Sequence, residues 1–145
     1  MCLVVDLAKT LRMKKKLAKC KRVAVWKKVK VIMQPLHDGQ IYTVLTQHQS
    51  TEIRGPGMHK AARKFTKEVR DHVDISRGVV HAFCHKPALR LSYSPYVNFA
   101  ALKLWLSSKD FVAVGRSHDI CGRKFKIEKA DWNRFAKKAM LPKQT

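Results

Sequence analysis

Acidic residues are scarce in this sequence, and their scarcity is its most informative feature. Ten Asp and Glu stand against 31 Lys and Arg, so the 145-residue chain carries a formal net charge of +21. Because the few carboxylates are scattered, paired acids for glycoside hydrolysis or for an oxygen-ligated metal site are scarce as well. A net charge this high instead predicts attraction to a polyanionic partner.

Long apolar runs are missing too. No stretch approaches the ~20 consecutive apolar residues of a membrane-spanning helix. The first six residues lack the basic segment and the long apolar segment of a secretory signal. We therefore expect no membrane span and no secretion, although an apolar content of 46% is that of a globular domain.

Motifs for nucleotide cofactors and for redox chemistry are absent as well. The sequence contains neither a Walker A motif nor Gly-x-Gly-x-x-Gly, and its four cysteines form no Cys-x-x-Cys pair. Without a secretory signal, we expect the thiols to be reduced and mostly buried. The sequence therefore predicts no cofactor and indicates no small-molecule substrate.

What the sequence does contain is a concentration of positive charge near its start. Residues 7–37 include eleven Lys and Arg and no acid. Lys and Arg neutralise phosphates without reading sequence, so the expected partner is nucleic acid or an acidic protein surface, within a larger assembly. The predicted polyanion-binding residues are Lys9, Arg12, Lys14, Lys15, Lys16, Lys19, Lys21, Arg22, Lys27, Lys28 and Lys30.

Residues 1–22 form a basic segment for which two structures remain open. Asp6 can cap a helix that runs to about residue 19 and carries an imperfect apolar stripe. The alternative is an extended arm that becomes ordered only on its partner. Residues 23–139 are predicted to form a single α+β domain, and residues 140–145 a tail.

Alternating apolar and polar residues predict most of the strands. Residues 23–33 alternate, residues 40–46 are rich in β-formers, and Asp38-Gly39 between them predicts a β-hairpin. Residues 98–106 fit either a strand or a helix, and their alternating leucines favour the strand. Further strands are expected over residues 78–84, 111–114 and 123–128.

Helical spacing occurs in two further places. Apolar residues recur along one face of residues 58–73 and cations along the other, which predicts an amphipathic basic helix. Asp131 is predicted to cap a C-terminal helix that ends before Pro142. The predicted fold class is therefore α+β: a small antiparallel sheet with an N-terminal hairpin, one amphipathic basic helix and a C-terminal helix.

Two constellations could carry chemistry. His81-x-x-Cys84 and His118-x-x-Cys121 supply the ligand types of a tetrahedral zinc site, but residues three apart on a strand face opposite sides, which argues against a shared ion. Cys84, His81 and Asp110 would supply a nucleophile, a base and an acid, although no local motif supports that triad. We predict no catalytic residue and no metal site, and a metal or thiol enzyme remains the third hypothesis.

Four short segments follow one another in a recognisable order. They are residues 1–6, Trp26-Lys27-Lys28-Val29-Lys30-Val31, Arg77-Gly78-Val79-Val80-His81-Ala82-Phe83 and Lys109-Asp110-Phe111-Val112-Ala113-Val114-Gly115. The series resembles small uncharacterised proteins of bacteriophages and large DNA viruses, which show a Gly-Ile-His-Ala-Phe-like strand, another strand and an Asp-x-Val-Ala-x-Gly turn. Here Val79-Val80 replaces the usual single Ile, and the long basic segment before Val23 is unusual. The resemblance implies an α+β fold and a viral origin, and it implies no catalytic residues.

These observations lead to a hypothesis for the function. The leading one is a non-enzymatic basic viral protein that docks on a polyanion, as a minor capsid or nucleoprotein component of a virion assembly. The alternative is a soluble nucleic-acid-binding regulator or anti-defence protein. The expected location is the virion or the host cytoplasm or nucleus.

Overall fold

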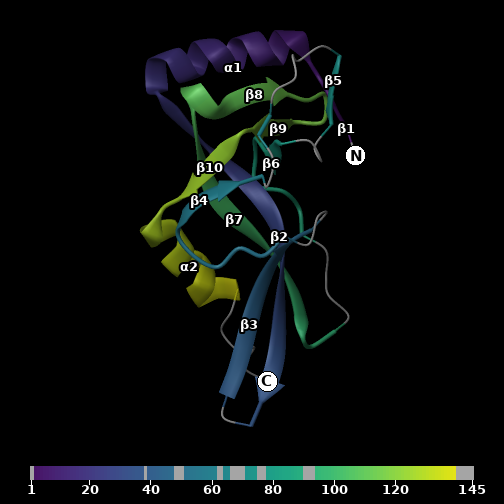
Figure 1. Cartoon of the computed structure of the whole chain (residues 1–145), viewed down its shortest axis with the longest axis vertical. Helices are drawn as coiled ribbons and strands as arrows, with labels where there is room; N and C mark the ends of the chain where they lie inside the picture. The colour runs from purple at the N-terminus through teal and green to yellow at the C-terminus, as the bar shows by residue number, and fades with distance from the viewer. Residues whose placement is uncertain are drawn as a thin grey trace.

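A computed structural model describes residues 2–37, 39–47, 51–61, 64–65, 71–74, 78–89 and 94–139. The described part of the chain is mixed α and β, with antiparallel strands predominating (Figure 1). Its elements in chain order are β1 (Cys2–Val4), α1 (Leu7–Cys20), β2 (Arg22–Leu36), β3 (Gly39–Thr46), β4 (Gly57–Lys60), β5 (His72–Asp74), β6 (Val80–Phe83), β7 (Val97–Ser107), the 3-10 turn η1 (Ser108–Asp110), β8 (Phe111–Val114), β9 (Asp119–Gly122), β10 (Lys124–Ile127) and α2 (Lys129–Ala139).

Eight of the strands form one antiparallel sheet in the order β4-β10-β7-β2-β6-β9-β8, with β3 added to β2. Its longest ladder joins β2 to β7, from the pair Arg22↔Ser107 to the pair Ile32↔Val97. The far half of β2 pairs with β3, and this hairpin projects from the rest of the molecule (Figure 1). β1 and β5 form a separate two-stranded sheet. β2 therefore runs from the body of the protein to the tip of the hairpin.

The core lies on one face of β2 and β7 because their residues alternate. Val25, Val29 and Val31 of β2 are buried together with the alternating leucines of β7. Phe125 of β10 is buried in the same cluster. A smaller cluster lies around β1, β5, β8 and β9, and its buried residues are Leu3, Val5, Val73, Val79, Val112, Ala113 and Cys121.

The basic segment that begins the chain is a helix rather than an extended arm. Asp6 precedes α1 as its N-cap, and its carboxylate accepts a hydrogen bond from the Lys9 backbone N–H at 3.0 Å. Thr10 and Leu17 are buried on one side of the helix. The Thr10 hydroxyl donates to the Val114 carbonyl and accepts from the Val114 N–H, which fixes α1 against β8. Figure 1 shows α1 lying across the end of the sheet opposite the hairpin.

The predicted hairpin is present, but the small sheet that it was expected to begin is not. β2 and β3 pair around the turn, from Val29↔Thr46 to Leu36↔Gly39. The sheet that contains them has eight strands, and β1 and α1 precede the hairpin. The short β4, β6, β9 and β10 extend the sheet because each is buried on alternate residues or throughout. The ambiguous residues 98–106 lie in β7, as the alternating leucines indicated.

The prediction of an amphipathic helix over residues 58–73 is wrong at both ends of that range. Residues 58–60 belong to β4, and residues 72–73 belong to β5. In β4 the side chains of Met58 and Lys60 are exposed and His59 is buried, so the true period there is two. Pairing with β10 supplies the hydrogen bonds that a helix would have made internally. Residues 62, 63 and 66–70 lie outside the described part of the chain.

The C-terminal helix is present, but Asp131 does not cap it. α2 begins two residues earlier, at Lys129, so Asp131 lies in its first turn. The Asp131 carboxylate instead accepts a hydrogen bond from the Trp105 indole N–H of β7 at 2.8 Å. Phe135 is buried against the core, and α2 packs on β7. The predicted tail, residues 140–145, lies outside the described residues.

Candidate polyanion-binding groove

A groove of about 440 Å³ runs between α1 and the sheet, and we call it the α1 groove. One wall is the face of α1, and the other is made by the ends of β6 and β9. Part of β2 and Val114 of β8 also line it. Its lining residues are Lys9, Arg12, Met13, Lys16, Val23, Ala24, Val25, Cys84, His85, Val114 and His118.

Helical spacing places three cations on one wall of the groove. Lys9, Arg12 and Lys16 are separated by three and four residues, so they lie along one face of α1. The Lys9 ammonium also donates a hydrogen bond to the Arg116 carbonyl at 3.3 Å, which holds its side chain over the sheet. The neighbouring Lys14 and Lys15 are exposed and do not line the groove. The predicted cations of α1 therefore include groove-lining residues and outward-facing ones.

The opposite wall brings together residues from two loops. The Cys84 backbone N–H donates to the His118 carbonyl at 2.8 Å, which joins the end of β6 to the turn before β9. His118 adopts a φ of 58°, and its ring centroid lies 5.8 Å from that of His85. Among the described residues that line the groove, none is acidic. The walls thus present ammonium, guanidinium and imidazole groups to a shared space.

The thiol in this groove is poorly suited to act as a nucleophile. Burial raises the pKa of the Cys84 thiol, and the negative charge of Asp119 raises it further. Lys9 and Lys16 act in the opposite direction. A raised pKa leaves little thiolate at neutral pH, and the thiolate is the reactive form.

The four zinc candidates do not converge on one point. His81 and Cys121 pair across β6 and β9, whereas Cys84 and His118 line the α1 groove. Burial raises the pKa of Cys121 to about 12, which disfavours the thiolate that zinc requires. Within the described ranges, no group of three or more His, Cys, Asp or Glu is arranged to hold a metal ion.

The proposed triad of Cys84, His81 and Asp110 is not assembled either. The carboxylate beside His81 is that of Asp119, whose Oδ2 lies 3.2 Å from the His81 Nε2. Asp110 is buried and accepts a hydrogen bond from the Ser107 hydroxyl at 2.8 Å. The short η1 turn keeps Asp110 beside Ser107. No motif in the sequence indicated this contact.

Lys27 is a member of the predicted binding set that the fold turns away from the surface. It lies on the core face of β2 between Val25 and Val29, and its ammonium donates to the His81 carbonyl at 2.6 Å. Burial lowers the pKa of Lys27 to about 8. An inward ammonium with a backbone partner is not available to a polyanion, so Lys27 does not belong to the binding surface.

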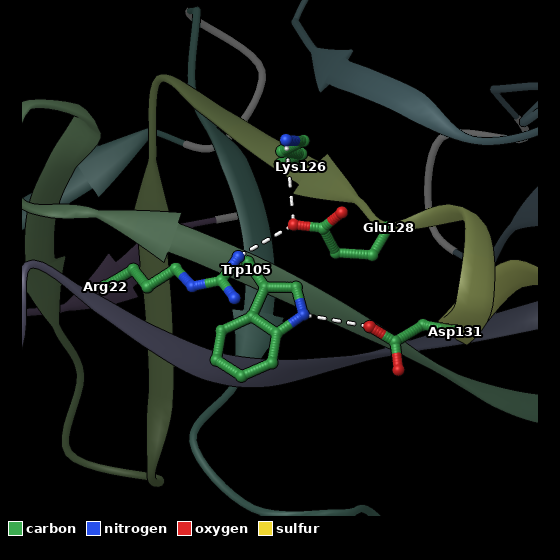
Figure 2. A network of polar contacts seen from close by, with 5 residues as sticks. All are labelled: Arg22, Trp105, Lys126, Glu128 and Asp131. Carbon is green, nitrogen blue, oxygen red and sulfur yellow. Dashed lines mark hydrogen bonds and ion pairs between the residues drawn. The ribbon is translucent and has the colours of Figure 1, made fainter.

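Arg22 is engaged within the protein as well. Its guanidinium donates to the Glu128 carboxylate at 2.7 Å and lies 4.1 Å from the centroid of the Trp105 ring. Figure 2 shows that Lys126 reaches the same Glu128 oxygen, at 3.6 Å, and that the Trp105 indole points to Asp131. This network ties the start of β2 and the start of α2 to β7.

The acids that the structure describes serve mostly internal contacts. Asp6 caps α1, Asp119 faces His81, and Asp110 accepts from Ser107. Glu128 and Asp131 belong to the network of Figure 2. None of these carboxylates lines the α1 groove, although the negative charge of Asp119 reaches Cys84 at its wall. The sequence did not reveal His85 as part of a basic wall, since one histidine beside a strand carries no motif.

Comparisons with protein-family models, with curated proteins and with solved structures return no match. Neither helix in the described part of the chain combines the length and the apolar character that crossing a membrane requires. The assignment of function therefore depends on the geometry and charge of the α1 groove.

Proposed function

We propose that this protein is a non-enzymatic binder of the phosphate backbone of nucleic acid, and that the α1 groove is its binding site. One observation carries the proposal: Lys9, Arg12 and Lys16 line a single groove with His85 and His118, and none of the described residues that line it is acidic. Cations gathered in a groove attract a polyanion more strongly than the same cations spread over a surface, because low-dielectric walls focus the field.

The spacing of the cations favours a linear polymer over an irregular acidic protein surface. Three and four residues of α-helix correspond to about 4.5 and 6 Å along the helix axis. Each strand of B-DNA carries one charge per about 3.4 Å of helix axis, so phosphates recur closely enough to supply a partner for each of these cations. Backbone neutralisation of this kind confers affinity without base specificity. The role in a virion or nucleoprotein assembly rests on the resemblance to viral proteins and extends the same proposal.

Two double variants with the same change in charge test the proposal. Arg12→Ala with Lys16→Ala removes two cations from the groove, and Lys14→Ala with Lys15→Ala removes two from the outward face. We expect the groove variant to bind a labelled oligonucleotide more weakly, and its plot of log K against log salt to be less steep by roughly 1.5–2. Fluorescence anisotropy at several salt concentrations measures both quantities.

The outward-facing variant is the matched control, and its affinity should change much less. Thermal melting of both variants checks that α1 remains folded, since neither variant alters the buried Thr10 or Leu17. Equal losses of affinity in the two variants would mean that net charge alone attracts the polyanion. That result would contradict the assignment of the groove.

A further inference from the structure

A second groove, of about 250 Å³, lies between α2 and β7, and we call it the α2 groove. Its floor is largely apolar and includes Trp26 and Phe99. Four cations stand around this floor, and they are Lys86, Lys103, Arg134 and Lys138. One acid, Asp131, also lines it; its carboxylate accepts from the Trp105 indole N–H and lies 3.7 Å from the Arg134 guanidinium. An apolar floor with a cationic rim suits a ligand that is flat and apolar in one part and anionic in another.

Trp26 differs from the other two tryptophans in its surroundings. Trp105 is held by the Asp131 carboxylate and lies near the Arg22 guanidinium, and Trp132 packs on Phe135 at 5.4 Å between ring centroids. Trp26 is partly exposed and lines the α2 groove, with the Lys86 ammonium 5.8 Å from its ring centroid. A partly exposed indole beside an ammonium presents both a stacking surface and a phosphate partner.

The two grooves adjoin each other along β2 and along the segment after β6. Ala24 lines the α1 groove and Trp26 lines the α2 groove, and these residues project from the same face of β2 about 7 Å apart. His85 lines the first groove, and the next residue, Lys86, lines the second. One extended polymer can therefore leave the cations of α1, pass His85 and Lys86, and reach Trp26.

We propose that the α2 groove holds an unstacked base of single-stranded nucleic acid on Trp26, while Lys86, Arg134 and Lys138 contact the flanking phosphates. This inference rests on the function proposed for the α1 groove and adds the class of nucleic acid. A duplex keeps its bases stacked in its interior, so it can satisfy the α1 cations but cannot place a base on Trp26. The protein therefore prefers single strands to duplexes.

Substitution of Trp26 tests the inference. The probes are a labelled oligothymidylate of about 12 nucleotides, a duplex of the same length and polyglutamate, all at low salt. Stacking of one base corresponds to roughly a 5- to 150-fold change in affinity. We expect a loss within that range for Trp26→Leu with the single strand and no comparable loss with the duplex.

Two further variants separate stacking from general damage. Trp26→Phe keeps an aromatic face and should retain most of the affinity for the single strand. Tyr96→Leu removes another exposed aromatic side chain, one that lines neither groove, and should change nothing. Thermal melting shows whether Trp26→Leu is folded. If it is not, Trp26→Phe tests the stacking site instead. The single strand should then quench the tryptophan fluorescence of Trp26→Phe less than that of the wild type.

The possible failures are distinguishable. If wild-type protein binds both nucleic acids equally and Trp26→Leu loses no affinity for the single strand, backbone binding stands and the stacking site is wrong. If wild-type protein binds polyglutamate more tightly than the single strand, the α2 groove is a site for acidic peptides, which also overturns the inference. If no nucleic acid binds at low salt, the proposed function itself fails and the inference fails with it.

Discussion

Two groups that could carry positive charge are shielded from water in this already basic protein: His59 is buried and Lys27 is half-buried. His59 lies on β4 and is 9% exposed. Burial lowers the pKa of His59 to about 4, and the positive charge of Lys27 contributes to the shift. Burial likewise lowers the pKa of Lys27 to about 8. The fold therefore favours the neutral form of both groups, because each charge would have to leave water.

The first consequence is a loss of stability in mild acid. The unfolded chain takes up a proton on His59 near its ordinary pKa of 6.5, whereas the folded protein does so only near 4. Because the unfolded state binds more protons in that interval, the free energy of unfolding falls as pH drops from 6.5 to 4. The loss attributable to His59 is about 3 kcal/mol at most. Urea unfolding at several pH values measures it.

His59→Gln removes the titrating group and serves as the comparison. Its free energy of unfolding should depend less on pH between 6.5 and 4 than that of the wild type, whatever its absolute stability. An unchanged pH dependence would mean that His59 is protonated in the folded protein.

Lys27 also makes the free energy of unfolding rise with pH, but in alkali. Because its pKa is lowered in the folded protein, stability increases as pH rises from about 8 to 10.5.

Among the elements, β9 depends on a close backbone approach at Gly122. A Cβ atom at Gly122 would lie 2.7 Å from the Leu106 Cδ1 and 2.9 Å from the Asp110 carbonyl oxygen. The second neighbour is backbone and cannot rotate away. We expect Gly122→Ala to lower the free energy of unfolding by about 1–3 kcal/mol, with a matching fall in the denaturation midpoint.

Gly55→Ala is the matched control for this prediction. Nothing lies within 4 Å of the position that its Cβ would occupy. The same substitution there should change stability little, so a similar loss in both variants would point to a backbone effect common to glycine rather than to crowding at β9.

At the scale of elements, local pattern was sufficient for the long strands and for the four-residue strands β6, β8 and β10, but not for β4. β7 was expected because its leucines alternate over many residues, and the β2–β3 hairpin because Asp38-Gly39 separates two β-rich runs. β4 was predicted as helix because its residues fit a helical period together with those that follow, and its pairing partner β10 lies more than sixty residues away. Tertiary pairing decides such segments, and a single sequence does not display it.

The residues of the proposed binding site were likewise predicted only in part. The cations of α1 were predicted from their density in the sequence, and the helix was one of the two structures that Asp6 allowed. Lys27 was included because it lies in the basic stretch, and the sequence does not show that its ammonium donates to the His81 carbonyl. The α2 groove was missed altogether, since Trp26 and Arg134 meet only after β2, β7 and α2 have packed together.

For the whole molecule, the net charge makes stability and binding respond to salt in opposite directions. A charge of +21 destabilises the compact state by self-repulsion, and salt screens that repulsion. Raising sodium chloride from about 50 to about 300 mM should therefore raise the melting temperature, while the same change weakens binding to nucleic acid. Calorimetry and anisotropy on the same samples measure the two trends.

An uncharged osmolyte at equal osmolality is the control for the melting experiment. With the osmolyte, the melting temperature should not show the steep initial rise that screening produces at low ionic strength. A melting temperature that falls with sodium chloride would show that the internal ion pairs, such as Arg22 with Glu128, outweigh the repulsion among the surface cations.

The scarcity of carboxylates also constrains how many copies can gather on one polymer. The net charge already counts every carboxylate, so copies crowded on the proposed polymer must take their remaining neutralising charge from the strand they share. With +21 per chain and one negative charge per nucleotide, charge balance is reached at about 21 nucleotides per copy. Beyond that loading, further copies repel one another, and the polymer rather than the protein limits the density of the assembly.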